Sequence, residues 1–275
     1  MTEGIDNTLL ERFEQEVWSK VPHLEGNDGV SKVVNATPLV DITEDFKECA
    51  KSVFNLNLTD ADLKVFGKFD STLLTGSIKV RPAANIIHDA IVTGKLRSGQ
   101  TVIEATSGNF GIALGLLSKL ELNVIALVSR KLQEGVFEEL RNVNIRTMDL
   151  DMDICPAPGM EGKQDLLVAK ASAANIRSQL FNFGYDTAIF DKASSEIESF
   201  LASQDIINLA KYLAKIYGFF CPEQYDSQLN IDAHRTVTAA EIDQQLHEKG
   251  DSLEGYSIFC TFLSLIHISE PTRPY

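Results

Sequence analysis

Between Lys64 and Asp151, the sequence alternates short apolar runs with stretches of helical periodicity. This alternation is typical of strand–helix–strand units, in which helices cover a parallel sheet. The apolar runs predict strands at residues 63–69, 101–105, 124–128 and 145–150. The stretches between them predict helices at residues 78–93, 111–120 and 132–142. We therefore expect an α/β protein built on a parallel sheet.

The remaining chain predicts mostly helices. Further helices are expected at residues 162–180, 199–217 and 239–249, and a strand is expected at residues 256–261. The N-terminal arm, up to about Lys32, reads as an amphipathic helix followed by a loop. We expect this arm to pack on a partner, with a frayed terminus as the alternative.

Composition excludes several classes of protein. The chain has 275 residues, is 44% hydrophobic and carries a net charge of -14 without a basic run, which argues against nucleic acid or an anionic membrane as the partner. No apolar run is long enough to span a bilayer and no signal peptide begins at Met1, so we expect a cytoplasmic protein that binds a small molecule. The cysteines lack the spacing of a disulfide framework or a zinc site, and we expect reduced, mostly buried thiols and no metal: Cys49, Cys155, Cys221 and Cys260.

Two polar turns that contain glycine each lie between a predicted strand and a predicted helix. The first is Thr75-Gly76-Ser77-Ile78-Lys79, and the second runs from Thr106 to Gly111 with the sequence TSGNFG. Such a turn presents free backbone N–H groups at the positive end of a helix dipole, which suits a carboxylate or a phosphate.

The order and spacing of the two turns resemble the fold-type II pyridoxal-phosphate enzymes, and specifically the cysteine synthase and cystathionine β-synthase family. Residues 35–40 (NATPLV) look like an early family element, and residues 94–106 (GKLRSGQTVIEAT) follow the family pattern. Gln224-Tyr225 and residues 230–242 are similar to the stretch before the family's glycine-rich phosphate loop. The resemblance covers most of residues 33–262. It implies a two-lobed parallel-sheet fold of the tryptophan synthase β-subunit-like class.

The resemblance also implies the roles of individual residues. Lys79 matches the lysine that forms a Schiff base with pyridoxal 5'-phosphate and then acts as base and acid at the substrate α-carbon. Asn109 matches the residue that hydrogen-bonds the ring hydroxyl of the cofactor. The substrate carboxylate is expected to bind Thr106, Ser107, Gly108, Asn109 and Gln224. The alternatives are a solvated lysine and a plain helix-capping turn.

The implied activity is β-replacement on serine, O-acetylserine or O-phosphoserine through an aminoacrylate intermediate, in a homodimer. One alternative is β-elimination or dehydration of the same substrates. A second is a non-catalytic subunit of the same fold, which would need neither Lys79 nor Asn109.

Some residues depart from the family pattern. Val80 replaces the usual aspartate, and Leu73-Leu74 replace Asn-Pro. Phe110 replaces a threonine, and we expect this change to remove a hydroxyl donor and to narrow the substrate pocket.

Residues 183–217 form an insertion. An additional structural helix is the default interpretation of this insertion, with a lid or a subunit contact as the alternative.

We divide the chain into an N-terminal arm with the start of the large lobe (1–66), the region that bears Lys79 and Asn109 (67–225), the start of the C-terminal part of the large lobe (226–262) and a tail (263–275). The tail, LSLIHISEPTRPY, is similar to a translated sequencing-library adapter, with a natural polar C-terminus as the alternative. We expect the native gene to continue beyond Phe262 with the phosphate loop, and the chain as given to be inactive.

Overall fold

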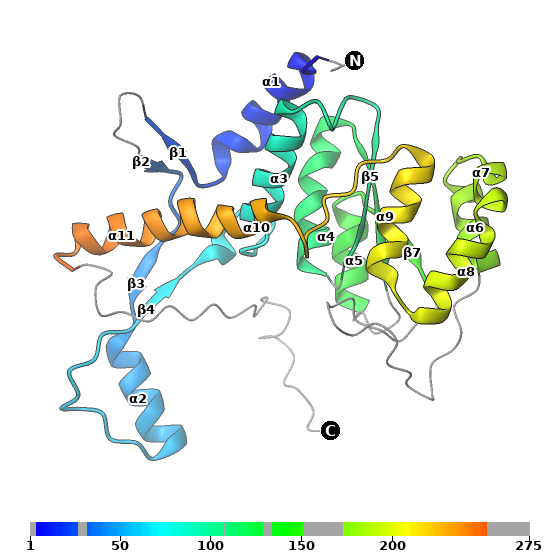
Figure 1. Ribbon diagram of the computed structural model, residues 1–275. Coiled ribbons are helices and arrows are strands. Elements are labelled where there is room, and N and C mark those ends of the chain that lie inside the picture. The colour runs from blue at the N-terminus through cyan, green and yellow to red at the C-terminus, as the bar shows by residue number, and fades with distance from the viewer. Residues whose placement is uncertain (1–3, 27–31, 107, 129–133, 151–172, 252–275) are drawn as a thin grey trace.

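The computed structural model describes residues 4–26, 32–106, 108–128, 134–150 and 173–251 (Figure 1). The α-helices are α1 (Asn7–Glu16), α2 (Thr43–Phe54), α3 (Val80–Val92), α4 (Asn109–Leu114), α5 (Glu134–Asn142), α6 (Ala173–Asn182), α7 (Thr187–Lys192), α8 (Ser194–Ser203), α9 (Ile206–Tyr217), α10 (Gln228–Asp232) and α11 (Ala239–Glu248). The strands are β1 (His23–Glu25), β2 (Lys32–Val34), β3 (Leu39–Asp41), β4 (Phe66–Lys68), β5 (Thr101–Ala105), β6 (Asn123–Val128) and β7 (Arg146–Asp149). Shorter helical turns are η1 (Trp18–Lys20), η2 (Asp70–Thr72), η3 (Gly115–Leu120) and the π-helical η4 (Ala233–Thr238).

A parallel sheet forms the centre of the described structure. Its strand order is β5-β6-β7, with Thr101 opposite Asn123 and Ile125 opposite Arg146. Phe220 extends the sheet beyond β5, because its N–H donates to Thr101 O and its carbonyl accepts from Ile103 N, both at 2.9 Å. The predicted parallel α/β architecture is thereby confirmed for these strands.

Alternate residues of β5 and β6 point to opposite faces of the sheet, as the pleat of a strand requires. On one face, Val102 and Val124 join a core shared with α1, α3, α4 and η3. On the other face, Ile103 and Ile125 join a second core shared with α6, α7, α8 and α9. Figure 1 shows these two groups of helices on either side of the sheet. Because both faces are covered, the strands read as continuous apolar runs in the sequence.

The first predicted strand does not join the parallel sheet, which corrects our expectation. The strand of this segment is β4, and it pairs antiparallel with β3, so that Val40 lies opposite Gly67. An apolar run predicts a strand but carries no information about the strand with which it pairs. Here the pairing strand, β3, precedes α2 in the sequence, and β4 follows α2.

The predicted helix at residues 199–217 is divided into α8 and α9. The backbone turns at Gln204, which has a left-handed conformation with φ 60°. The Asp205 side chain then accepts a hydrogen bond from Asn208 N at 3.0 Å and caps α9. A residue in the left-handed region followed by an N-cap ends one helix and starts another, although the apolar pattern runs through both.

Helix α1 packs within its own chain, whereas we expected the N-terminal arm to pack on a partner. Leu9 and Phe13 are each 1% exposed, and they lie in the core formed with α3 and η3.

The insertion at residues 183–217 contributes structural helices to the core, which is its default interpretation. Helix α9 packs against β5 and buries Leu209 and Leu213.

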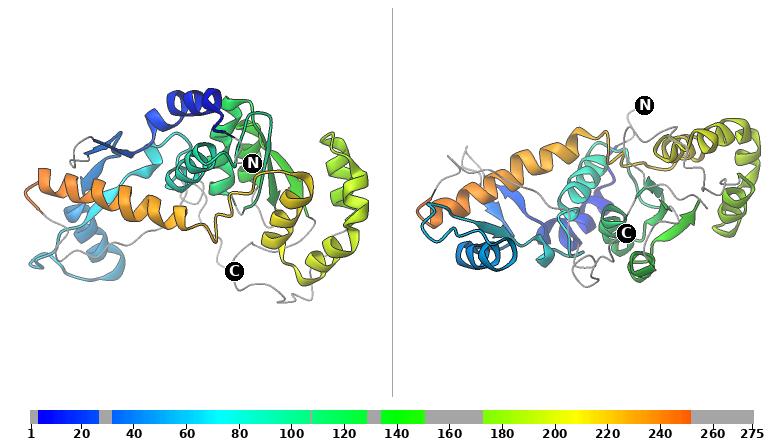
Figure 2. Two further views of the ribbon diagram at one scale, coloured as in Figure 1. Left: turned by 45° about the horizontal axis from the view of Figure 1, so that its top comes forward. Right: turned by 90° about the horizontal axis from the view of Figure 1, so that it is seen from below.

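The last described helices form one continuous rod from α10 through η4 to α11. This rod leaves the body of the molecule and passes beside the antiparallel strand pairs β1-β2 and β3-β4, as both views in Figure 2 show. It contacts β2 through a hydrogen bond of 3.3 Å from Val33 N to Gln244 Oε1.

Several predictions fall outside the described residues. They are the strand at 256–261, the first part of the helix at 162–180, the tail at 263–275, and the residues Ser107, Cys155 and Cys260. Of the described cysteines, Cys221 is half-buried, but Cys49 is exposed on α2, contrary to our expectation. In the described ranges, we find no helix with the length and apolar character that a membrane crossing requires.

Candidate active site

The first predicted turn leads directly into α3. Gly76 N donates to Leu73 O at 2.8 Å, and Gly76 has φ 69°, a conformation that favours glycine. Ser77 Oγ accepts a hydrogen bond from Lys79 N at 3.4 Å. Lys79 occupies the N-cap position of α3, and the helix continues through a bond from Ala83 N to Lys79 O.

Lys79 is half-buried at this helix start. Burial lowers the pKa of its amine below the ordinary value, because the charged form is poorly solvated there. A larger fraction of the amine is then neutral at a given pH, and the neutral amine is the nucleophile. The position therefore suits a lysine that attacks a carbonyl group.

Thr75, four residues before Lys79, has a buried hydroxyl oxygen without a hydrogen-bond partner among the residues that the structure describes. A buried polar group without a partner is costly, and in a native protein it calls for an explanation such as a ligand. A polar ligand bound beside the Lys79 turn would satisfy this hydroxyl.

The second predicted turn connects β5 to α4. Thr106 is buried, and its Oγ1 accepts hydrogen bonds from Gly108 N at 3.2 Å and from Gly111 N at 3.1 Å. Gly108 has φ 146°, and a Cβ atom at Gly111 would lie 2.7 Å from Thr106 Cγ2. Both positions therefore require glycine, and the turn is closely packed around the threonine.

Asn109 is the first residue of α4 and is half-buried. The next residue, Phe110, is 2% exposed and lies in the core between the sheet and α3. We expected Phe110 to narrow the substrate pocket, but its side chain packs in this core.

Gln224 lies at the same end of β5 as the second turn. Its Nε2 donates to Ala105 O at 2.9 Å, and its backbone N donates to Glu104 Oε2 at 3.1 Å. The structure thus brings Gln224 next to the strand end that precedes Thr106, although the two lie far apart in the sequence.

Glu104 is 1% exposed and accepts the backbone N–H of Ala105 at 3.0 Å through its other oxygen. Burial raises the pKa of this carboxyl to about 8, in spite of the N–H groups of Gln224 and Ala105, which favour the charged form. Sequence reasoning did not select Glu104. The signal that could have indicated it is a glutamate within a strand that is otherwise mostly apolar.

The helix that begins at Lys79 packs against the helix that begins at Asn109. Helix α3 also contacts α10, through a bond of 2.9 Å from Asn85 Nδ2 to Leu229 O. Helix α10 is in turn tied to Gln224, because Asn230 Nδ2 donates to Gln224 O at 2.8 Å. Figure 1 shows α3 between α4 and α10. Ser107 lies outside the described residues, so its place beside these helices is not part of the description.

A parallel sheet covered on both faces, with ligand-facing turns at helix starts, is the architecture of an α/β enzyme. Among solved structures, the chain is similar to O-ureido-L-serine synthase, with a TM-score of 0.50 and 23% sequence identity over 77% of this chain and 48% of that one. The fold class is that of the fold-type II pyridoxal-phosphate enzymes.

The sequence comparisons identify the family. The family model described as "Pyridoxal-phosphate dependent enzyme" matches residues 34–260, and the chain belongs to this family. A cysteine synthase of Staphylococcus aureus (strain Mu50) is 24% identical over 222 residues, which cover 81% of this chain and 53% of the relative. A cysteine synthase of Aquifex aeolicus (strain VF5) is 34% identical over 96 residues, which cover 35% of this chain and 27% of the relative. The chain therefore spans about half of the first relative's length and less of the second.

The described residues fit the cofactor of this family. Lys79 offers a partly desolvated amine, and Thr75 offers a buried hydroxyl that lacks a partner among the described residues. The turn at Thr106 adds a second polar element at a helix start. These are groups that can hold the aldehyde and ring of a planar aromatic cofactor. We assign no residue to its phosphate, because we expect the phosphate loop in the continuation of the native gene beyond Phe262.

Proposed function

We propose that this protein carries out pyridoxal-phosphate-dependent β-replacement on serine or an O-activated serine. The observation that carries the proposal is the position of Lys79, half-buried at the start of α3 with a lowered amine pKa. The family membership and the similarity to cysteine synthases support it. When bound, the cofactor supplies an electron sink for charge that develops at the substrate α-carbon.

In this proposal, Lys79 has two tasks. Its neutral amine attaches the cofactor, and the same nitrogen then removes and returns the proton at the substrate α-carbon. Both tasks require an amine that gains and loses a proton near neutral pH. Partial burial favours this behaviour, because it disfavours the ammonium form.

The turn at the end of β5 is proposed to bind the substrate carboxylate through Thr106, Ser107, Gly108 and Asn109. A hydroxyl has two acceptor lone pairs and one donor hydrogen. The bonds from Gly108 N and Gly111 N use the lone pairs of Thr106, so its hydrogen remains to donate to a carboxylate. Gln224 is proposed as a further carboxylate ligand, held at this place by its bond to Ala105 O. Asn109 is also proposed to hydrogen-bond the ring hydroxyl of the cofactor.

The direct test is to incubate the full-length protein with pyridoxal phosphate, reduce it with borohydride and locate the modified lysine by peptide mass spectrometry. We expect Lys79 to carry the label in preference to exposed lysines such as Lys95, because its amine is held in a site that also binds the rest of the cofactor. A label on another lysine, or no specific label, would contradict the proposal and favour a non-catalytic subunit of the same fold.

Asn109→Ala should impair the chemistry more than the fold. In the full-length protein, we expect turnover of O-acetylserine with sulfide to fall about 10- to 100-fold, while the free energy of unfolding changes by about 1 kcal/mol or less. Asn182→Ala, at an exposed position of α6, is the matched control and should leave both quantities unchanged. Normal turnover by Asn109→Ala would remove Asn109 from the site.

The finer features of the protein are also proposals. We propose a homodimer, a cytoplasmic location and an amino-acid substrate, of which the family membership and the similarity to cysteine synthases support the amino-acid substrate. The division of the chain at residues 66, 225 and 262 remains a proposal as well. Sedimentation analysis of the purified protein would test the dimer.

A further inference from the structure

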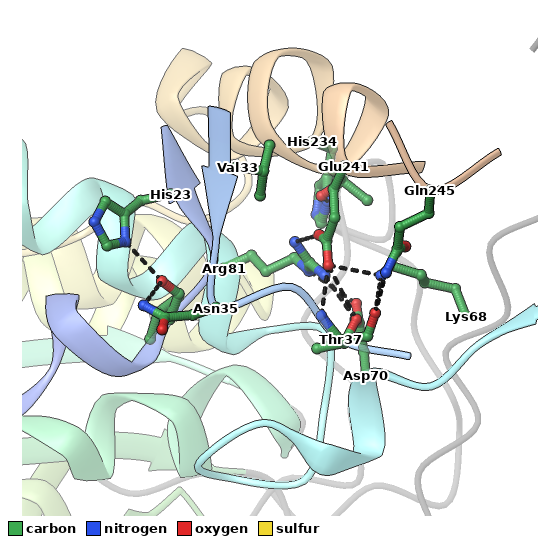
Figure 3. Close-up of polar contacts among 12 residues, drawn as sticks. His23, Val33, Asn35, Thr37, Lys68, Asp70, Arg81, His234, Glu241 and Gln245 are labelled. Carbon is green, nitrogen blue, oxygen red and sulfur yellow. Dashed lines mark hydrogen bonds and ion pairs between the residues drawn. The ribbon is translucent and has the colours of Figure 1, made fainter. Parts of the chain in front are cut away.

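A buried cluster of charged side chains surrounds Arg81, two residues after Lys79 (Figure 3). Arg81 Nε and Nη2 donate to the two carboxylate oxygens of Asp70 at 2.9 and 2.8 Å. Nη2 also donates to Thr37 Oγ1 at 3.2 Å, and Nη1 forms an ion pair of 2.6 Å with Glu241 Oε2. The guanidinium therefore connects three separate segments at once.

The second half of the cluster is built on Glu241 and Lys68. Glu241 Oε1 accepts from Lys68 Nζ and from Thr37 N, both at 2.6 Å. Lys68 Nζ also donates to Thr37 O at 2.6 Å and to Gln245 Oε1 at 2.9 Å. The cluster, which we call the Arg81 cluster, consists of Thr37, Lys68, Asp70, Arg81, Glu241 and Gln245.

The Arg81 cluster is deeply buried and contains two positive and two negative side chains. Glu241 is 0% exposed and Arg81 is 2% exposed. Burial works against the charge of Arg81, but the hydrogen bonds to Asp70 and Glu241 outweigh it and raise the pKa of the guanidinium above its ordinary value. Apolar side chains of similar volume often stabilise a core as well as such a network does, so the network is better explained by the geometry that it fixes.

The geometry that the cluster fixes is that of the first turn of α3. Arg81 is anchored to the segment before β3, to the start of η2 and to α11. Residues two apart in a helix point about 200° apart around its axis. The anchors of Arg81 therefore hold the helix from the side roughly opposite to Lys79.

We infer that Arg81 and Glu241 are positioning residues, which fix the start of α3 so that the Lys79 amine is held in its reactive place. This inference rests on the proposed function of Lys79. Its physical basis is that a reacting group gains most of its effectiveness from its orientation, and that a displacement of about 1 Å can cost about 100-fold in rate. Neither residue is proposed to touch the substrate.

The test measures the rate at which pyridoxal phosphate and borohydride label Lys79, with Lys95 as the internal reference. The double variant Arg81→Met/Glu241→Met removes one charge of each sign, so that the cluster stays neutral. We expect the rate at Lys79 to fall about tenfold or more, while the rate at Lys95 does not change. Arg81→Lys should recover part of the loss, because an ammonium keeps the charge but cannot bridge Asp70, Thr37 and Glu241 at once.

A matched control separates positioning from general destabilisation. Ile197→Ala creates a cavity in the core on the other face of the sheet, where Ile197 is fully buried on α8. We expect this variant to lose thermal stability and yet to label Lys79 at the wild-type rate. If the double variant does not fold, the comparison of Arg81→Lys with Ile197→Ala decides the question.

Two outcomes would overturn the inference alone. They are wild-type labelling of Lys79 in the folded Arg81 variants, and an equal loss of labelling in Ile197→Ala. If the wild-type protein is labelled at another lysine, the proposed function fails and the positioning role falls with it. The labelling site in the wild-type protein thus distinguishes the two failures.

Discussion

In the full-length protein, replacement of Lys79 by methionine should abolish specific labelling by pyridoxal phosphate and lower turnover about 1,000-fold or more, since one nitrogen serves as both attachment point and acid–base group. Methionine keeps the length and much of the volume of the lysine side chain but has no amine. Because Lys79 is half-buried at a helix N-cap and its charge is disfavoured by burial, the loss of the charge should not destabilise the fold. Mass spectrometry after borohydride reduction and a sulfide-dependent turnover assay measure the two effects.

Lys95→Met is the control for this prediction. Lys95 follows the same helix, α3, but it is exposed, and among the described residues its amine forms one long ion pair, of 3.9 Å with Asp89. This variant should label and turn over like the wild-type protein. Equal labelling of the Lys79→Met and wild-type proteins would show that another residue holds the cofactor.

The second large effect is a dependence of the free energy of unfolding on pH, which arises from the titration of Glu104. The folded protein holds the pKa of this carboxyl at about 8, and the ordinary value is 4.5. Between these values the folded state binds a proton that the unfolded state has lost, so the free energy of unfolding should fall as pH rises through this range. The contribution of Glu104 to this fall is up to about 5 kcal/mol.

Glu104→Gln should remove this dependence, because the amide does not titrate. At pH 5.5 we expect the variant to be less stable than the wild-type protein by about 1–2 kcal/mol, since the glutamine has one acceptor oxygen for the N–H groups of Ala105 and Gln224. At pH 8.5 the difference should shrink or reverse. Urea unfolding at several pH values measures it, and Glu198→Gln, at an exposed position on α8, is the control. Parallel pH profiles of the wild-type protein and Glu104→Gln would refute the assignment.

Ionisation of Glu104 is also expected to destabilise the candidate site. The carboxyl joins the end of β5 to the backbone of Gln224, and this strand end leads into the turn at Thr106. Ionisation of Glu104 would place an uncompensated charge in a buried environment directly behind this turn. Loss of stability at high pH should therefore begin near the proposed carboxylate site, which hydrogen exchange at Gly108 and Gly111 would detect.

The local sequence determined the elements of the parallel sheet and the two turns. The strand predicted at residues 101–105 has the bounds of β5, β6 begins one residue before its predicted start, and β7 is one residue shorter than its prediction at each end. Strands β5 and β6 are buried on both faces, so their mostly apolar sequences have clear limits. Both turns lie at helix starts as expected. Gly76 and Gly108 have positive φ angles that favour glycine, and at Gly111 a side chain would collide with Thr106.

Only the tertiary structure decided the partners of these elements. The antiparallel pairing of β4 with β3, the burial of Phe110 in the core and the packing of α1 on α3 all depend on contacts between distant parts of the chain. The Arg81 cluster joins residues that are up to 208 positions apart, such as Thr37 and Gln245. A periodic pattern reports which face of an element is buried, but it cannot report which distant side chain meets that face. The position of Lys79 at a helix start was therefore predictable from its turn, whereas the side chains that contact the first turn of this helix follow only from the tertiary structure.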